Sequence, residues 1–219
     1  MTATLKAYKG MGMEGRLARW YDKTTRKGMP EIRVLAARIC AIVPARAEVL
    51  EIAPGPGFLA IELAKRGMHV RAVDISKTFV EIARHNAAED GVTAQFEVGN
   101  AAALPLENES VDFVVCRAAF KNFSEPVKAL AEMKRVLRPG GTALLIDLRK
   151  DVRPDEIRSY VDGLGVGLLN RWFMILTFRG MLIKRAYQVE EIRRMIAEAG
   201  WTAPTIEIEK MGFEAWMTK

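Results

Sequence analysis

The sequence predicts a doubly wound α/β fold, in which helices cover both faces of a mostly parallel sheet. Short apolar segments with strand character alternate with amphipathic helical segments along residues 31–147. The chain then ends in two strand-like segments around Met211-Gly212, a hairpin signal that puts an antiparallel strand into the sheet. Its 219 residues, half of them hydrophobic and 27% charged, suit one globular domain with a substantial core.

The strands are expected where short apolar runs are bounded by turn residues or charges. Five such runs alternate with helices, and two more form the C-terminal hairpin. The expected strands cover residues 48–53, 69–74, 92–98, 111–116, 142–147, 205–209 and 213–218.

The helices between these strands carry start and stop signals. Ser76 is the expected N-cap of one helix, and Ser124 of another that has Pro126 in its first turn, where a missing N–H costs nothing. Gly67 and Gly91 each end a helix. The helices are expected at residues 31–43, 57–66, 76–90, 124–137 and 188–199.

The stretch 151–187 interrupts the alternation of strands and helices. It carries no strand signal, is rich in Leu, Trp, Phe and Met, and is expected to form two helices joined near Gly163, Gly165 and Gly167. We interpret it as a helical lid insertion rather than a separate domain. The expected single domain comprises N-terminal helices (1–44), a cofactor-binding core (45–150), the insertion (151–187) and a last helix with the strand hairpin (188–219).

Charge and composition exclude several classes of protein. The formal charge is +6, but Lys and Arg are mostly interleaved with acids, so no nucleic-acid partner is expected. The most apolar run, 172–178, is too short to span a bilayer, so no stable membrane insertion is expected. Cys40 and Cys116 lack metal-site spacing, and residues 1–10 lack the apolar core of a signal peptide. A cytoplasmic protein without a metal site is therefore expected.

A glycine turn follows the first expected strand. Residues 51–57 read Glu-Ile-Ala-Pro-Gly-Pro-Gly, and a helix begins directly after them. Glycines here let the backbone approach a ligand at the helix N-terminus. Asp74 ends the second strand, where a carboxylate can accept two ribose hydroxyls. Gly55, Gly57 and Ala60 also satisfy the dinucleotide pattern, so these features alone do not separate an NAD enzyme from other nucleotide binders.

Three further features decide against a dinucleotide. Glu51 precedes the glycines, where it would repel a pyrophosphate but could pair with an ammonium group. Asn100 follows the third strand, where an amide or acid can accept a hydrogen bond from an adenine amino group. The C-terminal hairpin is the third feature.

These features resemble the class I S-adenosylmethionine-dependent methyltransferases, specifically their ubiquinone/menaquinone-biosynthesis-like branch, across residues 48–147. Residues 135–141, Arg-Val-Leu-Arg-Pro-Gly-Gly, are similar to the family's R-V-L-K-P-G-G, and residues 104–115 resemble its L-P-F…F-D-x-V segment. The resemblance implies a Rossmann-like, seven-stranded sheet of order 3-2-1-4-5-7-6 with strand 7 antiparallel. It also implies S-adenosyl-L-methionine as cofactor and S-adenosyl-L-homocysteine as product.

The resemblance also suggests which residues hold the cofactor. Residues 51–57 resemble the family's D/E-x-G-x-G-x-G turn, Asp74 its ribose acid and Asn100-Ala101 its adenine-contacting Asp-Ala. Two residues depart from the pattern. Ala53 replaces a glycine, which is tolerable if its φ is negative, and Asn100 replaces an aspartate, which makes a weaker, uncharged hydrogen bond. The expected cofactor-binding residues are Tyr21, Glu51, Ala53, Pro54, Gly55, Gly57, Asp74, Ile75, Asn100, Ala101 and Arg117.

The substrate is expected beside the segment that follows the fourth strand, because ligands of this fold lie at the carboxyl ends of strands. His69 and His85 lie elsewhere, and Lys121 and Tyr21 are the candidate catalytic residues, although a solvated lysine and a helix-packing tyrosine are the alternatives. Trp172 and its aromatic neighbours either cap an apolar substrate, pack on the sheet, form a dimer contact or touch a membrane interface. The expected substrate-contacting residues are Tyr8, Phe120, Lys121, Asn122, Trp172, Phe173 and Phe178.

The leading functional prediction is methyl transfer to a small, largely apolar or aromatic molecule. The sulfonium leaving group is already activated, so the protein mainly aligns and desolvates the nucleophile rather than supplying a histidine base. Two alternatives remain open: a regulator or assembly factor that binds S-adenosylmethionine without turnover, and an NAD-dependent oxidoreductase. The partner is expected to be a small molecule, and the protein to be a monomer or homodimer.

Overall fold

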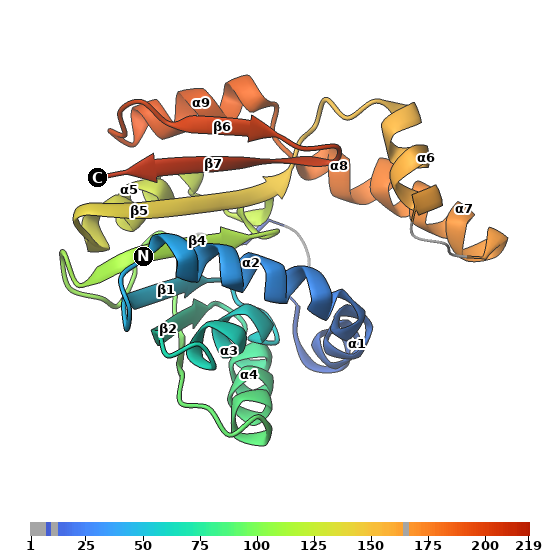
Figure 1. Cartoon of the computed structure of the whole chain (residues 1–219). Coiled ribbons are helices and arrows are strands. Elements are labelled where there is room, and N and C mark those ends of the chain that lie inside the picture. The colour runs from blue at the N-terminus through green and yellow to red at the C-terminus, as the bar shows by residue number, and fades with distance from the viewer. Residues whose placement is uncertain (1–7, 10–12, 164–166) are drawn as a thin grey trace, which may run out of the picture.

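The computed structural model describes residues 8–9, 13–163 and 167–219, and it contains one seven-stranded sheet (Figure 1). The strand order is β3-β2-β1-β4-β5-β7-β6, and β7 is antiparallel to both β5 and β6. Both features confirm the predicted fold. The strands are β1 (Glu48–Ile52), β2 (His69–Asp74), β3 (Gln95–Val98), β4 (Val111–Arg117), β5 (Leu137–Leu148), β6 (Thr205–Ile208) and β7 (Gly212–Thr218).

Helices cover both faces of the sheet because its strands are apolar on both sides. One face buries α2 (Met29–Ile42), α3 (Phe58–Ala64) and α4 (Lys77–Glu89) in a core that includes Val49, Phe113 and Leu144. The other face buries α5 (Pro126–Val136) and α9 (Val189–Glu198) against residues such as Leu50, Val114 and Leu145. Successive side chains along β1, β4 and β5 point to opposite faces of the sheet, and this alternation produces the two layers.

The N-terminal segment is fixed to α4. Helix α1 (Gly15–Thr25) continues through η1 (Arg26–Gly28) into α2. Just before α1, the Glu14 carboxylate accepts the N–H groups of Lys77 and Thr78, each at 3.1 Å, in the first turn of α4. This first turn is also capped by Ser76, as predicted, whose Oγ accepts the Phe79 N–H. The segment thus lies at the carboxyl ends of β1 and β2.

The insertion forms an arm that extends from the body of the protein (Figure 1). It contains α6 (Pro154–Gly163), α7 (Leu168–Thr177), a turn of π-helix, η3 (Phe178–Leu182), and α8 (Ile183–Arg185). Its apolar side chains form a separate small core that includes Val161, Ile175 and Met211. The prediction of helices without a strand is therefore confirmed for the described part, and Gly165 lies outside the described residues. A lid function stays a prediction.

Several predicted boundaries are wrong for local reasons. Strand β5 begins at Leu137 rather than at residue 142, because the expected turn at residues 138–141 is an irregularity within the β4–β5 pairing. Gly140 adopts a φ of +79° there. Strand β3 is shorter than expected and begins at Gln95. Ser124 is not the cap of α5, whose N-cap is Glu125 without a side-chain hydrogen bond.

Candidate active site

The predicted cofactor residues meet at the carboxyl ends of β1, β2 and β3. The turn after β1 needs residues with positive φ at Gly55 (+55°) and Gly57 (+82°). A Cβ on Gly57 would lie 2.8 Å from the Cβ of Ala83 and close to Phe96, so Gly57 allows α4 and β3 to pack against the turn. A Cβ on Gly55 would meet only Tyr21 at 4.0 Å, which leaves the backbone open to a ligand.

Ala53 adopts a left-handed conformation with a φ of +55°. Alanine would be tolerable at this position with a negative φ, but the observed φ is positive. The Ala53 N–H donates to the Val73 carbonyl at 2.8 Å, which extends the β1–β2 pairing beyond the strand and fixes this conformation. An alanine at such a position carries a strain of roughly 1–2 kcal/mol. The turn at the candidate site is thus a strained one.

Glu51 is almost completely buried, with 4% of its surface exposed, at the end of β1. Its Oε2 atom makes no hydrogen bond, and among the described residues only one other buried side-chain atom, Nε of Arg71, shares this condition. Burial raises the pKa of Glu51 to about 8, against the lowering effects of the Ala60 N–H and of Arg117. An unpaired buried carboxyl oxygen is a site for a cationic or donor group of a ligand.

Asp74 is buried as well, with 5% of its surface exposed. Its Oδ2 accepts the Gly55 N–H at 3.0 Å and its Oδ1 accepts the Ser76 N–H at 2.8 Å. Burial raises the pKa of Asp74 to about 6, although both hydrogen bonds lower it. Each carboxylate oxygen retains a second lone pair, so Asp74 can still accept hydroxyl groups while holding the turn.

Apolar side chains border Asp74 at the neighbouring strand ends. Ile75 follows β2 and Val98 ends β3, and both are exposed to solvent although they are large and apolar. Ala101 lies in the next loop, where the Asn100 Oδ1 accepts the Ala102 N–H at 2.9 Å. Sequence reasoning missed Val98, although its place as the last residue of a strand beside Asp74 was the available signal.

Tyr21 and Arg117 lie near the turn and come from different elements, α1 and β4. Tyr21 comes from α1 and packs edge-on against Phe79 with ring centroids 5.8 Å apart. Its hydroxyl has a raised pKa because of burial, and nearby Arg117 lowers that pKa in part. Arg117 ends β4 and is followed by Ala118, whose φ of +59° turns the chain away from the sheet. The structure therefore brings both predicted residues to the turn, together with Pro54.

Lys121 does not lie in solvent. Its Nζ donates to the Asp147 Oδ1 at 2.8 Å and to the Ala118 carbonyl at 2.6 Å, and both side chains of the ion pair are buried. The Lys121 N–H also donates to the Asp147 Oδ2 at 2.8 Å. The expectation of a solvated lysine is wrong, and sequence reasoning missed the pair. Its ammonium group holds the loop after β4 against the end of β5.

Phe120 and Asn122 flank this lysine in η2 (Phe120–Asn122) but do not line an open site together. Phe120 is completely buried and packs against Phe123 and Tyr187, with ring centroids 5.6 and 5.9 Å apart. It therefore has no surface for a substrate, and the expected contact is wrong. Asn122 is half-buried, and its carbonyl accepts the Lys9 N–H at 2.7 Å.

Tyr8 lies near groups from several parts of the site. It forms a β-bridge with Phe123, which places the N-terminal strand-like segment beside the loop after β4. Burial raises the pKa of the Tyr8 hydroxyl, Asp74, Tyr21 and Asp147 raise it further, and Arg185 lowers it. These electrostatic neighbours come from the sheet edge, α1 and the arm.

The aromatic residues of the arm do not converge on one point. Trp172 is exposed on α7, whereas Phe178 packs edge-on against Tyr160 within the small core of the arm. The side chain of Phe173 lies outside the described residues.

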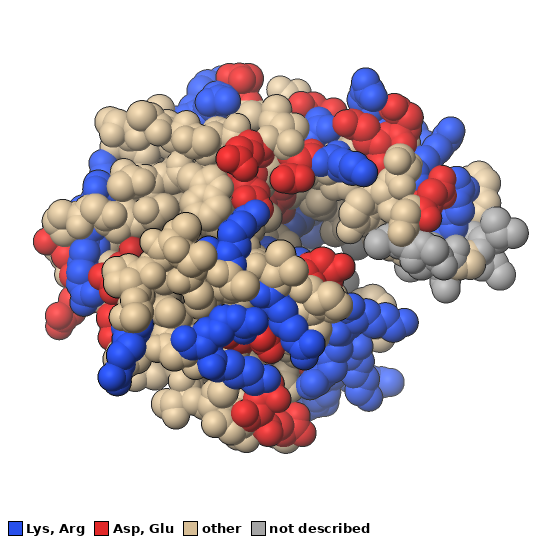
Figure 2. Space-filling view, viewed as in Figure 1, with Lys and Arg blue, Asp and Glu red and all other residues tan. Residues whose placement is uncertain are grey.

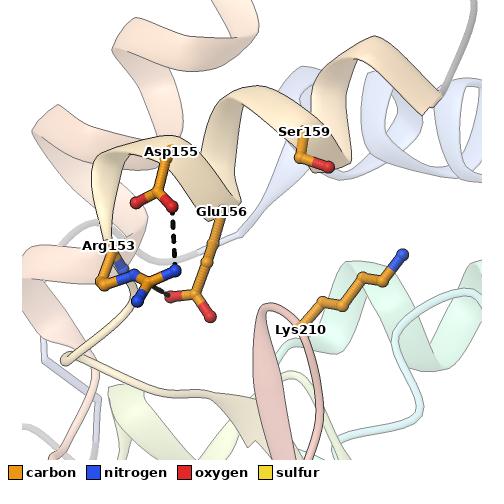
Figure 3. A pocket seen from close by; sticks show the side chains of 5 residues that line it. All are labelled: Arg153, Asp155, Glu156, Ser159 and Lys210. Atoms are coloured by element: carbon orange, nitrogen blue, oxygen red, sulfur yellow. Dashed lines mark hydrogen bonds and ion pairs between the residues drawn. The ribbon is translucent and has the colours of Figure 1, made fainter.

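Two cavities lie outside the glycine turn, and neither has a residue of this turn in its lining. A cavity of about 370 Å³ lies between α2 and the sheet and includes Arg117, Ile146 and Glu214 in its lining. A smaller cavity of about 230 Å³ lies at the arm, and Figure 3 shows Arg153 facing Asp155 and Glu156, whereas Lys210 extends from the β6–β7 turn on the side of Ser159. Its lining residues are Arg153, Asp155, Glu156, Ser159 and Lys210.

The two histidines lie away from this edge. His69 begins β2 and contacts Glu48 at 2.8 Å, and His85 is exposed on α4 beside Glu89. Within the described part of the chain, no three metal-binding side chains gather, and no helix is long and apolar enough to cross a membrane.

A family model described as a methyltransferase domain matches residues 50–145, which include the glycine turn, Asp74 and Asn100. Residues 50–145 of the chain are therefore similar to a methyltransferase domain. The cofactor of this family is S-adenosyl-L-methionine. The matched residues span the first five strands of the sheet, and the observed strand order is the one that the resemblance implied.

Several curated relatives have names that refer to quinone compounds. A demethylmenaquinone methyltransferase of Deinococcus radiodurans is 39% identical over 117 residues, which cover 52% of this chain and 48% of the relative. A ubiquinone/menaquinone biosynthesis C-methyltransferase of Brucella canis is 31% identical over 170 residues, 75% of this chain and 61% of the relative. The chain spans about half the length of the first curated relatives it matches.

Solved structures share the fold over nearly the whole chain. A Methanococcus maripaludis protein assigned to the S-adenosyl-L-methionine-dependent methyltransferases superposes with a TM-score of 0.76 at 23% identity, covering 96% of this chain and 95% of its own. A methyltransferase from Aquifex aeolicus has a TM-score of 0.63 at 22% identity, covering 87% and 97%. The arm and the N-terminal helices therefore belong to an architecture that other proteins share.

Proposed function

We propose that the protein transfers the methyl group of S-adenosyl-L-methionine to a small molecule with an apolar or aromatic body. The observation that carries this proposal is the buried Glu51 carboxyl group, whose Oε2 lacks a partner at the end of β1. The ammonium of the methionine end would supply that partner. The same oxygen would repel the pyrophosphate of a dinucleotide, which disfavours the oxidoreductase alternative.

The other residues of the turn fit the rest of the cofactor. Asp74 would accept the ribose hydroxyls with its free lone pairs, and the open side of Gly55 leaves room for the cofactor beside the backbone. Ile75 and Val98 would enclose the adenine ring, which explains why two large apolar residues are exposed without it. Asn100 would accept from the adenine amino group with its remaining lone pair.

When bound, S-adenosyl-L-methionine supplies an activated methyl group on a sulfonium. The residues of this chain would then orient the nucleophile and exclude water from it. Tyr21 would cover the turn, and the loop held by Lys121 and Asp147 would form the floor on the substrate side. Neither histidine reaches this edge, so a nucleophile that needs little deprotonation fits the site best.

Tyr8 and Arg185 are the proposed contacts for a polar oxygen of the substrate. Arg185 is close enough to lower the pKa of Tyr8, and Lys9 donates to the Tyr187 hydroxyl at 2.6 Å beside them. Phenolic and cationic donors together suit a hydroxyl or carbonyl oxygen on an aromatic ring. The names of the Deinococcus and Brucella relatives refer to quinone compounds, which belong to this chemical class.

Calorimetry with S-adenosyl-L-homocysteine tests the part of the proposal that concerns the cofactor. It compares the native chain with the variant Glu51→Gln. We expect micromolar binding to the native chain and at least tenfold weaker binding to the variant, because an amide lacks the charge to pair with an ammonium. Binding of NAD with no response to S-adenosyl-L-homocysteine would refute the proposal.

Turnover requires a second test. The native chain should transfer labelled methyl groups from S-adenosyl-L-methionine to a small molecule in an organic extract of cells that have lost this protein. Tight cofactor binding without any labelled product would instead support a regulator or assembly factor, the alternative that the absence of a histidine base leaves open.

The two free cysteines support a cytoplasmic location.

A further inference from the structure

Two of the four tryptophans are exposed, which is unusual for the largest apolar side chain. Trp201 is buried and Trp216 packs against Phe113, whereas Trp20 is 58% exposed and Trp172 is 70% exposed. Leu176, one helical turn after Trp172, is 71% exposed. Trp172 and Leu176 therefore form an apolar ridge on α7, and Trp20 is a second exposed apolar point on α1.

Cations surround both tryptophans. Residues 167–187 contain Arg171, Arg179, Lys184 and Arg185 but no acidic residue. Arg171 forms an ion pair with Asp162, and within the described part of the chain none of the other three forms one. Arg185 lies near Tyr8 at the candidate site, so Arg179 and Lys184 are the cations that add positive charge to the exposed surface of the arm.

Asp22 is the acid of α1 and is half-buried, whereas the cations of this helix are exposed. Asp22 contacts Asn86 and Arg26, and the nearby Glu14 binds the first turn of α4. No described residue forms an ion pair with Arg16, Arg19 or Lys23 of the same helix. A basic cluster results, which Figure 2 shows at the end of the molecule that α1 occupies.

Helices α1 and α7 occupy the same end of the protein. In Figure 1, both lie beyond the carboxyl ends of the parallel strands, where the candidate active site is located. Figure 2 shows that the surface is hollowed between the arm and the body at this end. A flat partner that touched α1 and α7 together would therefore cover the mouth of the site.

We propose that this end of the protein docks on the surface of an anionic lipid bilayer. Tryptophan among lysines and arginines on a short amphipathic helix is the composition that suits the headgroup region of a membrane. No described helix is long and apolar enough to cross a bilayer, so the contact is peripheral. A second copy of the chain fits less well, because it would bring two like-charged faces together.

The docked orientation also gives a route for the substrate. A molecule with an apolar body partitions into lipid, and the hollow between α1 and the arm would open toward it. This route rests on the proposed function, whereas docking itself does not. Vesicle binding and cofactor binding can therefore fail independently.

Cosedimentation with vesicles tests the docking. We expect the native chain to bind vesicles of phosphatidylcholine with 30% phosphatidylglycerol at 50 mM salt. Binding should weaken at least tenfold at 500 mM salt or with pure phosphatidylcholine. The double variant Trp172→Ala, Leu176→Ala should also bind at least tenfold more weakly. Ile208→Ala is the matched control, because Ile208 is 62% exposed on the edge strand β6 and should not affect binding.

The same variants report whether the fold and the cofactor site are intact. Their melting temperature and their affinity for S-adenosyl-L-homocysteine should match those of the native chain, because all the replaced side chains are exposed. Equal binding of the double variant and the native chain to anionic vesicles would overturn the proposal. A native chain that does not bind these vesicles at 50 mM salt would also overturn the proposal. A dimer in sedimentation velocity that the double variant abolishes would overturn it as well.

Discussion

The Asp74 Oδ2 accepts the backbone N–H of Gly55 at 3.0 Å, so the predicted ribose acid also holds the glycine turn. The two residues are 19 positions apart, at the ends of neighbouring strands. A carboxylate in this position therefore has two functions: it shapes the loop beside the cofactor and presents free lone pairs to it. Substitutions of Asp74 will affect both functions.

Asp74→Ala should weaken binding of S-adenosyl-L-homocysteine by about 2–4 kcal/mol, because two hydrogen bonds from ribose hydroxyls to a charged group are lost. It should also lower the melting temperature, since the N–H groups of Gly55 and Ser76 lose their acceptor. Calorimetry and thermal unfolding measure the two effects. An unchanged dissociation constant would remove Asp74 from the ribose site.

Ala53→Gly should stabilise the protein, because glycine adopts a φ of +55° without strain. After the greater chain entropy of glycine in the unfolded state is subtracted, we expect a gain of about 0.5–1 kcal/mol. Thermal unfolding should show a rise of roughly 1–4 °C.

Ala203→Gly is the matched control for Ala53→Gly, because Ala203 also has a positive φ, +49°, but lies outside the candidate site. Both variants should be stabilised, and only Ala53→Gly should alter cofactor affinity. A loss of stability in Ala53→Gly would show that the alanine methyl group makes a contact worth more than the strain.

The α/β alternation and the glycine turn could be predicted from sequence because their signals are local. Gly57 must be glycine where the chain has a φ of +82° and packs against Ala83, and Ser76 caps the helix that follows it directly. The conformation of Ala53 could not be predicted in the same way, because alanine favours a negative φ. The hydrogen bond from its N–H to the Val73 carbonyl imposes the positive φ.

The partner of Lys121 was hidden from the sequence for a different reason. Asp147 is 26 residues away, and the two meet only because β4 pairs in parallel with β5, with Arg117 opposite Ile146. The extra residues between Leu137 and Thr142 set that register, and sequence reasoning took them for a turn. Positions of side chains at a sheet edge depend on such register shifts.

The affinity for S-adenosyl-L-homocysteine should rise with pH through Glu51. The ligand-free protein holds a proton on this carboxyl group, because burial raises its pKa to about 8, and pairing with an ammonium requires that proton to leave. Between pH 6 and 7.5, the dissociation constant should therefore fall by up to tenfold per unit. Glu51→Gln should show little of this dependence. A native chain with constant affinity over this range would contradict the role of Glu51.

The stability of the ligand-free protein should depend on pH in the opposite direction. The folded pKa values of Glu51, about 8, and Asp74, about 6, both exceed those of ordinary carboxyl groups. The stabilisation that their protonated forms provide is complete below about pH 4 and is lost as pH rises through the folded values. Thermal unfolding from pH 5 to 8 should show a falling midpoint, and Glu51→Gln should flatten the fall. Glu62→Gln, at a carboxylate that pairs with Arg66 and whose pKa is lowered, should leave this fall unchanged.

Lys121→Met should destabilise the protein by about 3–5 kcal/mol, because it leaves the buried Asp147 carboxylate without its cation. Urea denaturation measures this loss. The double variant Lys121→Met, Asp147→Leu removes the unpaired charge and should recover part of the stability, although the N–H groups of Lys121 and Leu148 then lose an acceptor. The exposed pair Arg153–Asp155 is the control: Arg153→Ala should cost less than about 1 kcal/mol. Equal losses at the two pairs would mean that water reaches Asp147 and that Lys121 does not hold the loop after β4.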